Sequence, residues 1–204
     1  MPPRRTRDYR SPIREDAKAL TRQRIIEATV ALHAEKGVLA TTHADVAERA
    51  GVSLPTVYNH FPNSAALLPH CMGAVAATLP PIDREAILGE VEGARRIEAL
   101  VTAIYNRHER HAPWARWAVA DAPKVPELAI AIRERDRATA KLVNDALTFP
   151  PHRNPQRRVY AIARALLDFP AWRRLTDELG SSHAAIRAAS AAILAVHHHE
   201  GNSR

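Results

Sequence analysis

The chain has 204 residues, 46% of them hydrophobic and 25% charged, a balance that is typical of a folded globular protein and excludes a disordered one. Its 29 Lys and Arg against 22 Asp and Glu give a formal net charge of +7, which favours a polyanionic partner. The single cysteine excludes a disulfide framework and a cysteine-based structural zinc site.

Residues 1–16 are predicted to form a flexible basic arm, because they combine several arginines and prolines with almost nothing apolar to bury. Such an arm could lie along DNA phosphates or in a minor groove. It could equally be a solvated tail, since blocks of charge usually are.

A small helical domain is predicted over residues 17–79. Its first helix runs from Leu20 to Lys36, where apolar residues recur at helical spacing, and Gly37 ends it. A short second helix follows, with Thr42 as its N-cap and Asp45 in its first turn.

A tight turn at Gly51 is predicted to join this helix to another short one, and the pair has the form of a helix-turn-helix. Ser53 is the predicted N-cap of the later helix, and Pro55 is tolerated in its first turn. Pro62 ends that helix, and Asn63 caps the next.

The later helix of the motif has an apolar and a polar side, by about 100° per residue. Three residues define its predicted buried side: Leu54, Val57 and Phe61. Asn59 and Thr56 point away from it, which suits contact with base edges in a major groove. Tyr58 and His60 flank the exposed side and are expected to contact phosphates.

Residues 82–199 are predicted to form a larger helical bundle without strands. Apolar residues step by three and four from Ile97 to His108, and a long helix is expected from Glu127 to about Leu147. Between them, Pro113 and Pro123 bracket a predicted short helix.

Two further helices are predicted after Asn154–Pro155, which has the form of an N-cap and first helical residue. Their apolar faces carry small and branched residues: Ala163, Leu166 and Phe169 on one, and Ala185, Ala189, Ile193 and Val196 on the other. Because small residues let helices approach closely, we expect these faces to form a four-helix homodimer interface.

The bundle is expected to hold a ligand pocket near five residues: Tyr105, His108, Trp114, Trp117 and Arg135. Aromatic side chains dominate both cores and pockets, so the two tryptophans fit either role. Arg135 interrupts an apolar line and could meet an anionic ligand or pair with a carboxylate of a neighbouring helix. We expect a largely apolar small-molecule effector.

Three patterns could carry catalytic or metal chemistry. His70 and Cys71 diverge by about 100° on a helix, so a nucleophilic dyad is not expected and Cys71 is predicted to be a small hydrophobe. His108 and His111 share a helical face without a third ligand, and the histidines at 197–199 cannot all face one ion. We predict no enzyme activity, no cofactor and no metal site.

The segments RIIEATVALHAEKG and TTHADVAERAGVSLPTVYNHFPNSAALL resemble the DNA-binding domain of tetracycline-repressor-like (TetR family) transcriptional regulators. The resemblance is specific over residues 20–70 and architectural beyond them. It implies a homodimer that binds a palindromic operator on double-stranded DNA, usually represses, and releases DNA when a small molecule binds the body. Ser64 stands where that family commonly has a lysine that contacts a phosphate, so the basic arm or Arg22 could replace that contact.

The predicted protein is therefore all-α, with an N-terminal helix-turn-helix DNA-binding domain followed by a helical ligand-binding and dimerisation domain. The predicted DNA-binding residues are Thr42, His43, Ser53, Leu54, Pro55, Thr56, Tyr58, Asn59, His60 and Ser64. No apolar run approaches the roughly 18 residues that span a bilayer, and no secretory signal is recognised, so we expect a cytoplasmic protein without a membrane partner. Two alternatives are a helical small-molecule or metal-binding protein with a vestigial helix-turn-helix, and a small hydrolase that uses His and Cys.

Overall fold

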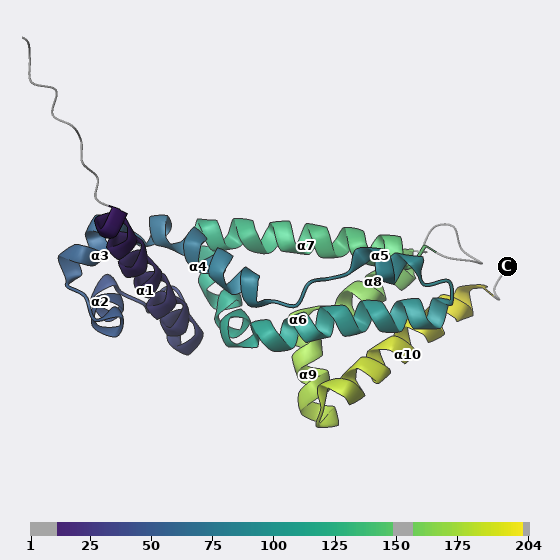
Figure 1. Cartoon of the computed structure of the whole chain (residues 1–204). Helices are drawn as coiled ribbons and strands as arrows, with labels where there is room; N and C mark the ends of the chain where they lie inside the picture. The colour runs from purple at the N-terminus through teal and green to yellow at the C-terminus, as the bar shows by residue number, and fades with distance from the viewer. Residues whose placement is uncertain (1–11, 149–156, 202–204) are drawn as a thin grey trace, which may run out of the picture. The chain divides into compact units, whose positions relative to one another are not determined.

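The computed structural model describes residues 12–148 and 157–201, and all regular structure within them is helical (Figure 1). The α-helices are α1 (Pro12–Lys36), α2 (His43–Ala50), α3 (Leu54–His60), α4 (Ser64–Thr78), α5 (Arg84–Gly89), α6 (Gly93–Asp121), α7 (Pro126–Ala146), α8 (Arg157–Leu166), α9 (Phe169–Leu179) and α10 (Ser182–Gly201). The predicted all-α fold, with a helix-turn-helix at the N-terminus and a helical C-terminal domain, is confirmed.

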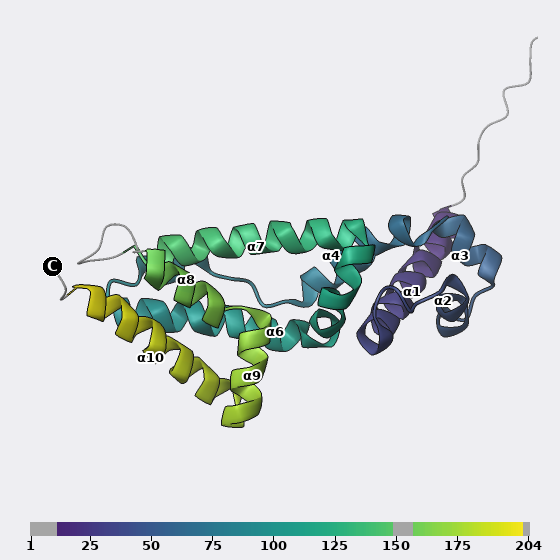
Figure 2. The same ribbon diagram turned by 180° about the vertical axis from the view of Figure 1, so that it is seen from behind.

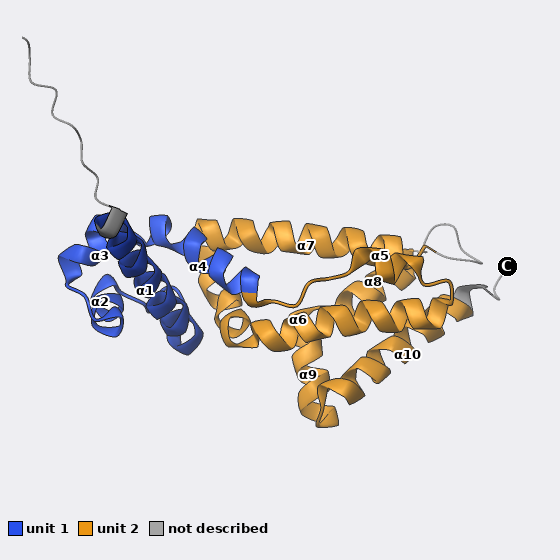
Figure 3. Ribbon diagram, in the orientation of Figure 1, with its two compact units in different colours: residues 1–77 blue, residues 78–204 orange. Residues whose placement is uncertain are grey.

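The chain divides into two compact units, residues 1–77 and residues 78–204 (Figure 3). The predicted first helix begins at Pro12 rather than Leu20, so the last part of the predicted basic arm is helical. Proline suits this start because a first-turn residue needs no helical N–H bond. The rest of that arm, residues 1–11, lies outside the described residues.

Unit 1 has its own core, in which one face of α1 packs on α2, α3 and the first half of α4. Ile25 and Leu32 lie two turns apart on α1, and both are buried. Val46 of α2 and Val57 of α3 pack against the same face. Burying each such side chain stabilises the unit by about 1.5–3 kcal/mol, which fixes the two short helices of the motif on the long one.

Unit 2 is a bundle in which α6 packs between α7 and α10. The apolar line of α6 that the sequence predicts is buried, with Ile97, Leu100 and Val101 each at 0% exposure. Figure 2 shows the side of unit 2 that carries α8, α9 and α10. Among the described helices, none alone is long and apolar enough to cross a membrane. Taken together α9 and α10 pass that test, but they are bent by 117°.

One proline does not end a helix where the sequence predicts. Pro113 lies inside α6, which continues to Asp121, so the predicted separate helix is wrong. The helix continues because its last turns still bury Ala115, although proline removes the bond that the Glu109 carbonyl would accept. Pro69 likewise lies inside α4.

The boundary between α8 and α9 also differs from the prediction. Phe169 begins α9 rather than extending the face of α8, because the Asp168 carboxylate accepts a hydrogen bond from the Phe169 backbone N–H at 2.9 Å and acts as N-cap. Pro170 then occupies the first turn. The predicted N-cap pair Asn154–Pro155 lies outside the described residues, and α8 is described from Arg157.

The apolar row that the sequence assigns to a dimer interface lies inside unit 2 instead. Four of its residues are buried within the single chain, at 0% or 1% exposure: Ala163, Ala185, Ala189 and Ile193. The other three are partly buried against the same core: Leu166, Phe169 and Val196. Helix contacts within one chain already cover Ala163, Ala185, Ala189 and Ile193, so these four residues cannot also face a second copy, and the prediction is corrected for them. Leu166, Phe169 and Val196 keep part of their surface exposed.

Candidate nucleic-acid interface and ligand pocket

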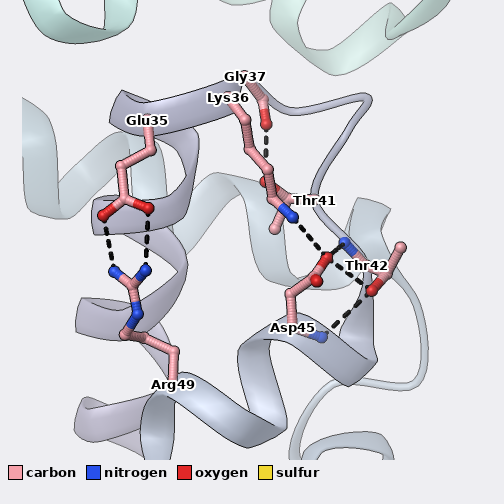
Figure 4. Close-up of polar contacts among 7 residues, drawn as sticks. All are labelled: Glu35, Lys36, Gly37, Thr41, Thr42, Asp45 and Arg49. Carbon is pink, nitrogen blue, oxygen red and sulfur yellow. Dashed lines mark hydrogen bonds and ion pairs between the residues drawn. The ribbon is translucent and has the colours of Figure 1, made fainter.

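The start of α2 is held by a capping box that the sequence predicts. The Thr42 hydroxyl accepts from the Asp45 backbone N–H at 3.2 Å, and the Asp45 carboxylate accepts from the Thr42 backbone N–H at 2.8 Å (Figure 4). Lys36 of α1 adds an ion pair of 2.8 Å to the same carboxylate. The Lys36 ammonium and then the Thr42 donors hold the pKa of Asp45 far below its usual range, so this box stays ionised and intact at neutral pH.

A second polar contact joins α1 to α2. The Arg49 guanidinium donates two hydrogen bonds to the Glu35 carboxylate, at 2.8 and 2.9 Å (Figure 4). This bidentate pair lowers the pKa of Glu35. Together with Lys36 and Asp45, it fixes the angle at which the motif leaves α1.

The turn between α2 and α3 depends on Gly51, whose backbone is left-handed with φ 62° and ψ 43°. Its N–H returns to the carbonyls of Ala47 and Glu48, as a C-cap does. Arg24 of α1 donates from Nη2 to the Ala50 carbonyl at 2.5 Å and to the Gly51 carbonyl at 3.3 Å. The long helix therefore satisfies the orphan carbonyls of the turn, a role for Arg24 that the helical periodicity did not reveal.

Helix α3 is capped by Ser53, as predicted, and the Ser53 hydroxyl accepts from the Thr56 backbone N–H at 3.3 Å. The hydroxyls of Ser53 and Thr56 share a further hydrogen bond of 2.7 Å, so the Thr56 hydroxyl is already engaged in the cap. Val57 and Phe61 are buried as the helical wheel predicts. Leu54 is 39% exposed, not buried, because it is the first residue of the helix and lies beyond the edge of the core.

The exposed side of α3 presents Tyr58 and Asn59, and Tyr58 is 49% exposed. The ring of His43 stacks on that of Tyr58, with centroids 4.8 Å apart and planes 11° apart. His43 also donates from Nε2 to the Phe61 carbonyl at 3.2 Å. His43 thus links the start of α2 to the end of α3, and it supports Tyr58 from one side while Tyr58 and Asn59 both remain exposed.

Burial lowers the pKa of His60, and the charges of Lys18 and Arg22 lower it further, so this residue is neutral at neutral pH. Arg22 donates to His70 Nε2 at 2.6 Å, and its guanidinium lies over the Phe61 ring, 4.9 Å from the centroid. Arg22 is a predicted substitute for the missing phosphate contact. In the structure its guanidinium already contacts His70 and Phe61.

The first residues of α4 are exposed at Ser64, and the Asn63 side chain accepts from the Ala66 backbone N–H at 2.9 Å, as its predicted cap role requires. Further along, Cys71 is buried at 1% exposure, and burial raises the pKa of its thiol to about 12. A thiol in that state is not a nucleophile at neutral pH. His70 is exposed and faces Arg22, so the arrangement is that of a core cysteine beside a surface histidine.

Unit 2 contains a cavity of about 340 Å³. Of the five residues predicted to line a pocket, His108 and Arg135 do so. Trp114 and Trp117 are not among its lining residues, because α6 continues through Pro113 and carries them past the cavity. The pocket is also more polar than predicted, because charged side chains form much of its wall.

Tyr105 is fully buried behind the cavity, and its hydroxyl donates to the Leu166 carbonyl at 2.8 Å. One turn further along α6, His108 donates from Nε2 to the Leu167 carbonyl at 2.9 Å. These two bonds hold the corner between α8 and α9. His111 lines the cavity one turn beyond His108, and burial, followed by the charge of Arg135, lowers its pKa to about 4.

The sequence analysis missed the other charged residues of the wall: Arg107, Asp136, Arg164 and Asp168. Arg107 follows the spacing of Ile104, His108 and His111 on one face of α6, a signal that was present in the sequence. Within the described part of the chain, no group of three His, Cys, Asp or Glu side chains is arranged to hold a metal ion.

Comparisons with known proteins bear on this motif. Residues 25–71 match the family model of bacterial regulatory proteins, tetR family. The HTH-type transcriptional repressor KstR2 of Rhodococcus jostii (strain RHA1) is 28% identical over 89 residues, a stretch of this chain that spans 44% of it and 44% of that relative's length.

Two solved structures share the fold. A transcriptional regulator from Rhodococcus sp. Rha1 has a TM-score of 0.58 and 22% identity, over 84% of this chain and 93% of that one. A regulator of the TerR/AcrR family from Aquifex aeolicus VF5 has a TM-score of 0.56 and 16% identity, over 86% and 99% of the two chains. The similarity of fold thus extends through both units.

Proposed function

We propose that this chain, which resembles bacterial regulatory proteins of the tetR family over residues 25–71, is a cytoplasmic transcriptional repressor that binds DNA as a homodimer. The observation that carries the proposal is the helix-turn-helix over residues 43–60, in which caps and α1 contacts fix the recognition helix and leave Tyr58 and Asn59 projecting. The net charge of +7 supports a polyanionic partner.

We place α3 in the major groove. Asn59 is shaped to bond an adenine edge, whereas the Tyr58 hydroxyl meets a phosphate, which carries no sequence information. The Thr56 hydroxyl already shares one hydrogen bond with Ser53, which leaves it fewer sites for DNA alongside its methyl group. The remaining predicted contacts lie at the starts of α2, α3 and α4 and at the end of α3: Thr42, His43, Ser53, Leu54, Pro55, His60 and Ser64.

Selection of bound fragments from a genomic DNA pool tests the proposal and yields the operator. We expect a palindrome with half-sites about one helical turn apart, and an affinity that falls steeply with salt. Asn59→Ala should cost about 1–3 kcal/mol on that site and relax preference at one position in each half-site. Tyr58→Phe should weaken specific and random DNA alike.

Gln23→Ala, on the exposed side of α1, serves as the control and should change neither property. Equal weakening of all sequences by Asn59→Ala would refute its role in base recognition. Absence of any salt-sensitive DNA binding would favour instead a helical small-molecule-binding protein with a vestigial motif.

For the homodimer, we propose the outward faces of α8 and α10 in place of the row that the core covers. Small exposed residues lie there: Ala161 on α8, and Ala191 and Ala195 on α10. Two such helices from each subunit would pack closely as four. Ala191→Glu should halve the mass measured by sedimentation and weaken operator binding, and an unchanged dimer mass would place the interface elsewhere.

For regulation, we propose that a small molecule binds in the cavity of unit 2 and weakens DNA binding. Coupling of this kind is typically about 1–3 kcal/mol, which corresponds to a loss of DNA affinity of about 5-fold to 150-fold. Gel shifts across a ligand panel test it. Full DNA affinity with a ligand demonstrably bound would refute the coupling.

A further inference from the structure

We propose that the cavity of unit 2 binds a small organic anion, a compound with one oxyanion group on a compact apolar body. This inference rests on the proposed function and deepens it, because it names the chemical class of the effector. The cavity of about 340 Å³ lies at the small end of the range of ligand pockets, which excludes a bulky molecule bound whole.

Arginines from three helices line the cavity: Arg107 of α6, Arg135 of α7 and Arg164 of α8. Arg107 Nη1 donates to the Pro80 carbonyl at 2.7 Å, and Arg164 Nη1 donates to the Asp136 carbonyl at 3.3 Å. Both contacts are to neutral backbone groups, and within the described residues neither arginine forms an ion pair. A guanidinium has five N–H donors, so each keeps donors for a ligand while its position is fixed.

The cationic groups of the wall act on one another. Burial lowers the pKa of Arg107, and the charge of Arg135 lowers it further. Burial is also the main cause of the lowered pKa of His108 and His111, to which Arg135 and Arg107 contribute. Both histidines are therefore neutral at neutral pH. An oxyanion among these groups would relieve the repulsion and gain charge-assisted hydrogen bonds.

The acidic groups of the wall do not cancel this charge. Asp136 is 3.4 Å from Arg135 and pairs with it. Asp168 is engaged as the N-cap of α9, where it accepts from the Phe169 N–H. Three guanidinium groups against two carboxylates, with neutral histidines, leave one net positive charge. That balance suits a ligand with one negative charge rather than a polyanion.

Apart from Thr139, the remainder of the wall is apolar. Ile104 and Leu167 are buried at 4% and 3% exposure, and Leu79 and Ile82 line the same cavity. Leu79 and Ile82 are only partly buried, so a free inorganic ion would leave their apolar surface facing water, whereas the hydrocarbon part of an organic anion would cover it. His108 bonds a carbonyl through Nε2, which can only donate there, so its neutral ring keeps Nδ1 as an acceptor.

Calorimetry on the full chain at pH 7.5 tests the proposal with two matched pairs of probes: octanoate against octanamide, and 3-phenylpropanoate against 3-phenylpropanamide. We expect at least one acid to bind about tenfold more tightly than its amide. Arg107→Gln should abolish that preference, and Arg164→Gln should reduce it. Arg110→Gln is the matched control, because Arg110 lies on α6 outside the cavity, and it should keep the preference.

Acids that bind no better than their amides, or a preference that survives both Arg107→Gln and Arg164→Gln in folded protein, would overturn the inference. Binding of inorganic phosphate as tightly as the acids would overturn the requirement for an apolar body. A gel shift with octanoate separates this proposal from the proposed function. An acid that binds through Arg107 yet leaves the DNA complex intact supports the anion site and refutes its coupling to DNA.

Discussion

Replacement of Gly51 by alanine tests how the turn of the motif is held. A left-handed backbone destabilises a residue with a Cβ by about 1–2 kcal/mol. Alanine also makes the unfolded chain less flexible, which stabilises the folded state by about 0.4–1 kcal/mol, so the free energy of unfolding should fall by about 1 kcal/mol. The new Cβ would also lie 3.0 Å from Arg24 Nη2. If the guanidinium swings away, its partly exposed bonds to two carbonyls are lost, at a further cost of about 1 kcal/mol.

All three tryptophans lie in unit 2, so fluorescence does not follow this motif. Hydrogen exchange of the α2 and α3 amides is the suitable assay, and about 2 kcal/mol corresponds to exchange about 30-fold faster. In an Arg24→Ala background, Gly51→Ala should accelerate exchange only about 5-fold. Gly73→Ala, in a helix with open space around it, should not accelerate exchange. Equal acceleration in both backgrounds would refute the role assigned to Arg24.

Three other predictions concern buried groups. Tyr105→Phe should destabilise unit 2 by about 1–3 kcal/mol in urea unfolding followed by tryptophan fluorescence, because the Leu166 carbonyl loses its partner; unchanged stability would contradict that bond. Cys71 should react with a thiol reagent only as fast as unit 1 unfolds, because burial raises its pKa to about 12, and immediate labelling would show that it is accessible. The pKa of His111 is lowered from its usual 6.5 to about 4, so between these pH values the folded protein binds fewer protons there than the unfolded chain. The free energy of unfolding should therefore fall as pH falls through that window, by about 2 kcal/mol between pH 7 and 5. His111→Asn should flatten this pH dependence, and an unaltered profile would assign it to other groups.

Local signals in the sequence predict the motif well. Thr42, Ser53 and Asn63 cap the helices that they are expected to cap, because an N-cap depends only on a side chain and an amide three residues later. The buried side of α3 follows from helical period alone, except at Leu54, where the helix has only begun. Arg24 escaped notice because its partners lie in the turn 26 and 27 residues later.

The body could be predicted less fully, for physical reasons. Pro113 is a helix breaker by local rules, yet packing on both sides of it keeps α6 continuous. Apolar faces on α8 and α10 indicate burial but not what buries them, so the pattern alone does not distinguish a row in the core from a dimer face. The cavity draws Arg107, Arg135 and Arg164 from three helices, and such convergence exists only once the bundle has folded.

The corner between α8 and α9 has a consequence for how related sequences diverge. Tyr105 and His108 both bond its carbonyls, and His108 also lines the cavity. A change of pocket shape at position 108 would loosen the corner, whereas Thr139 and Arg135 line the cavity without holding that backbone. In proteins that share this bundle but respond to different compounds, we therefore expect positions 135 and 139 to vary freely and positions 105 and 108 to change only together with the corner.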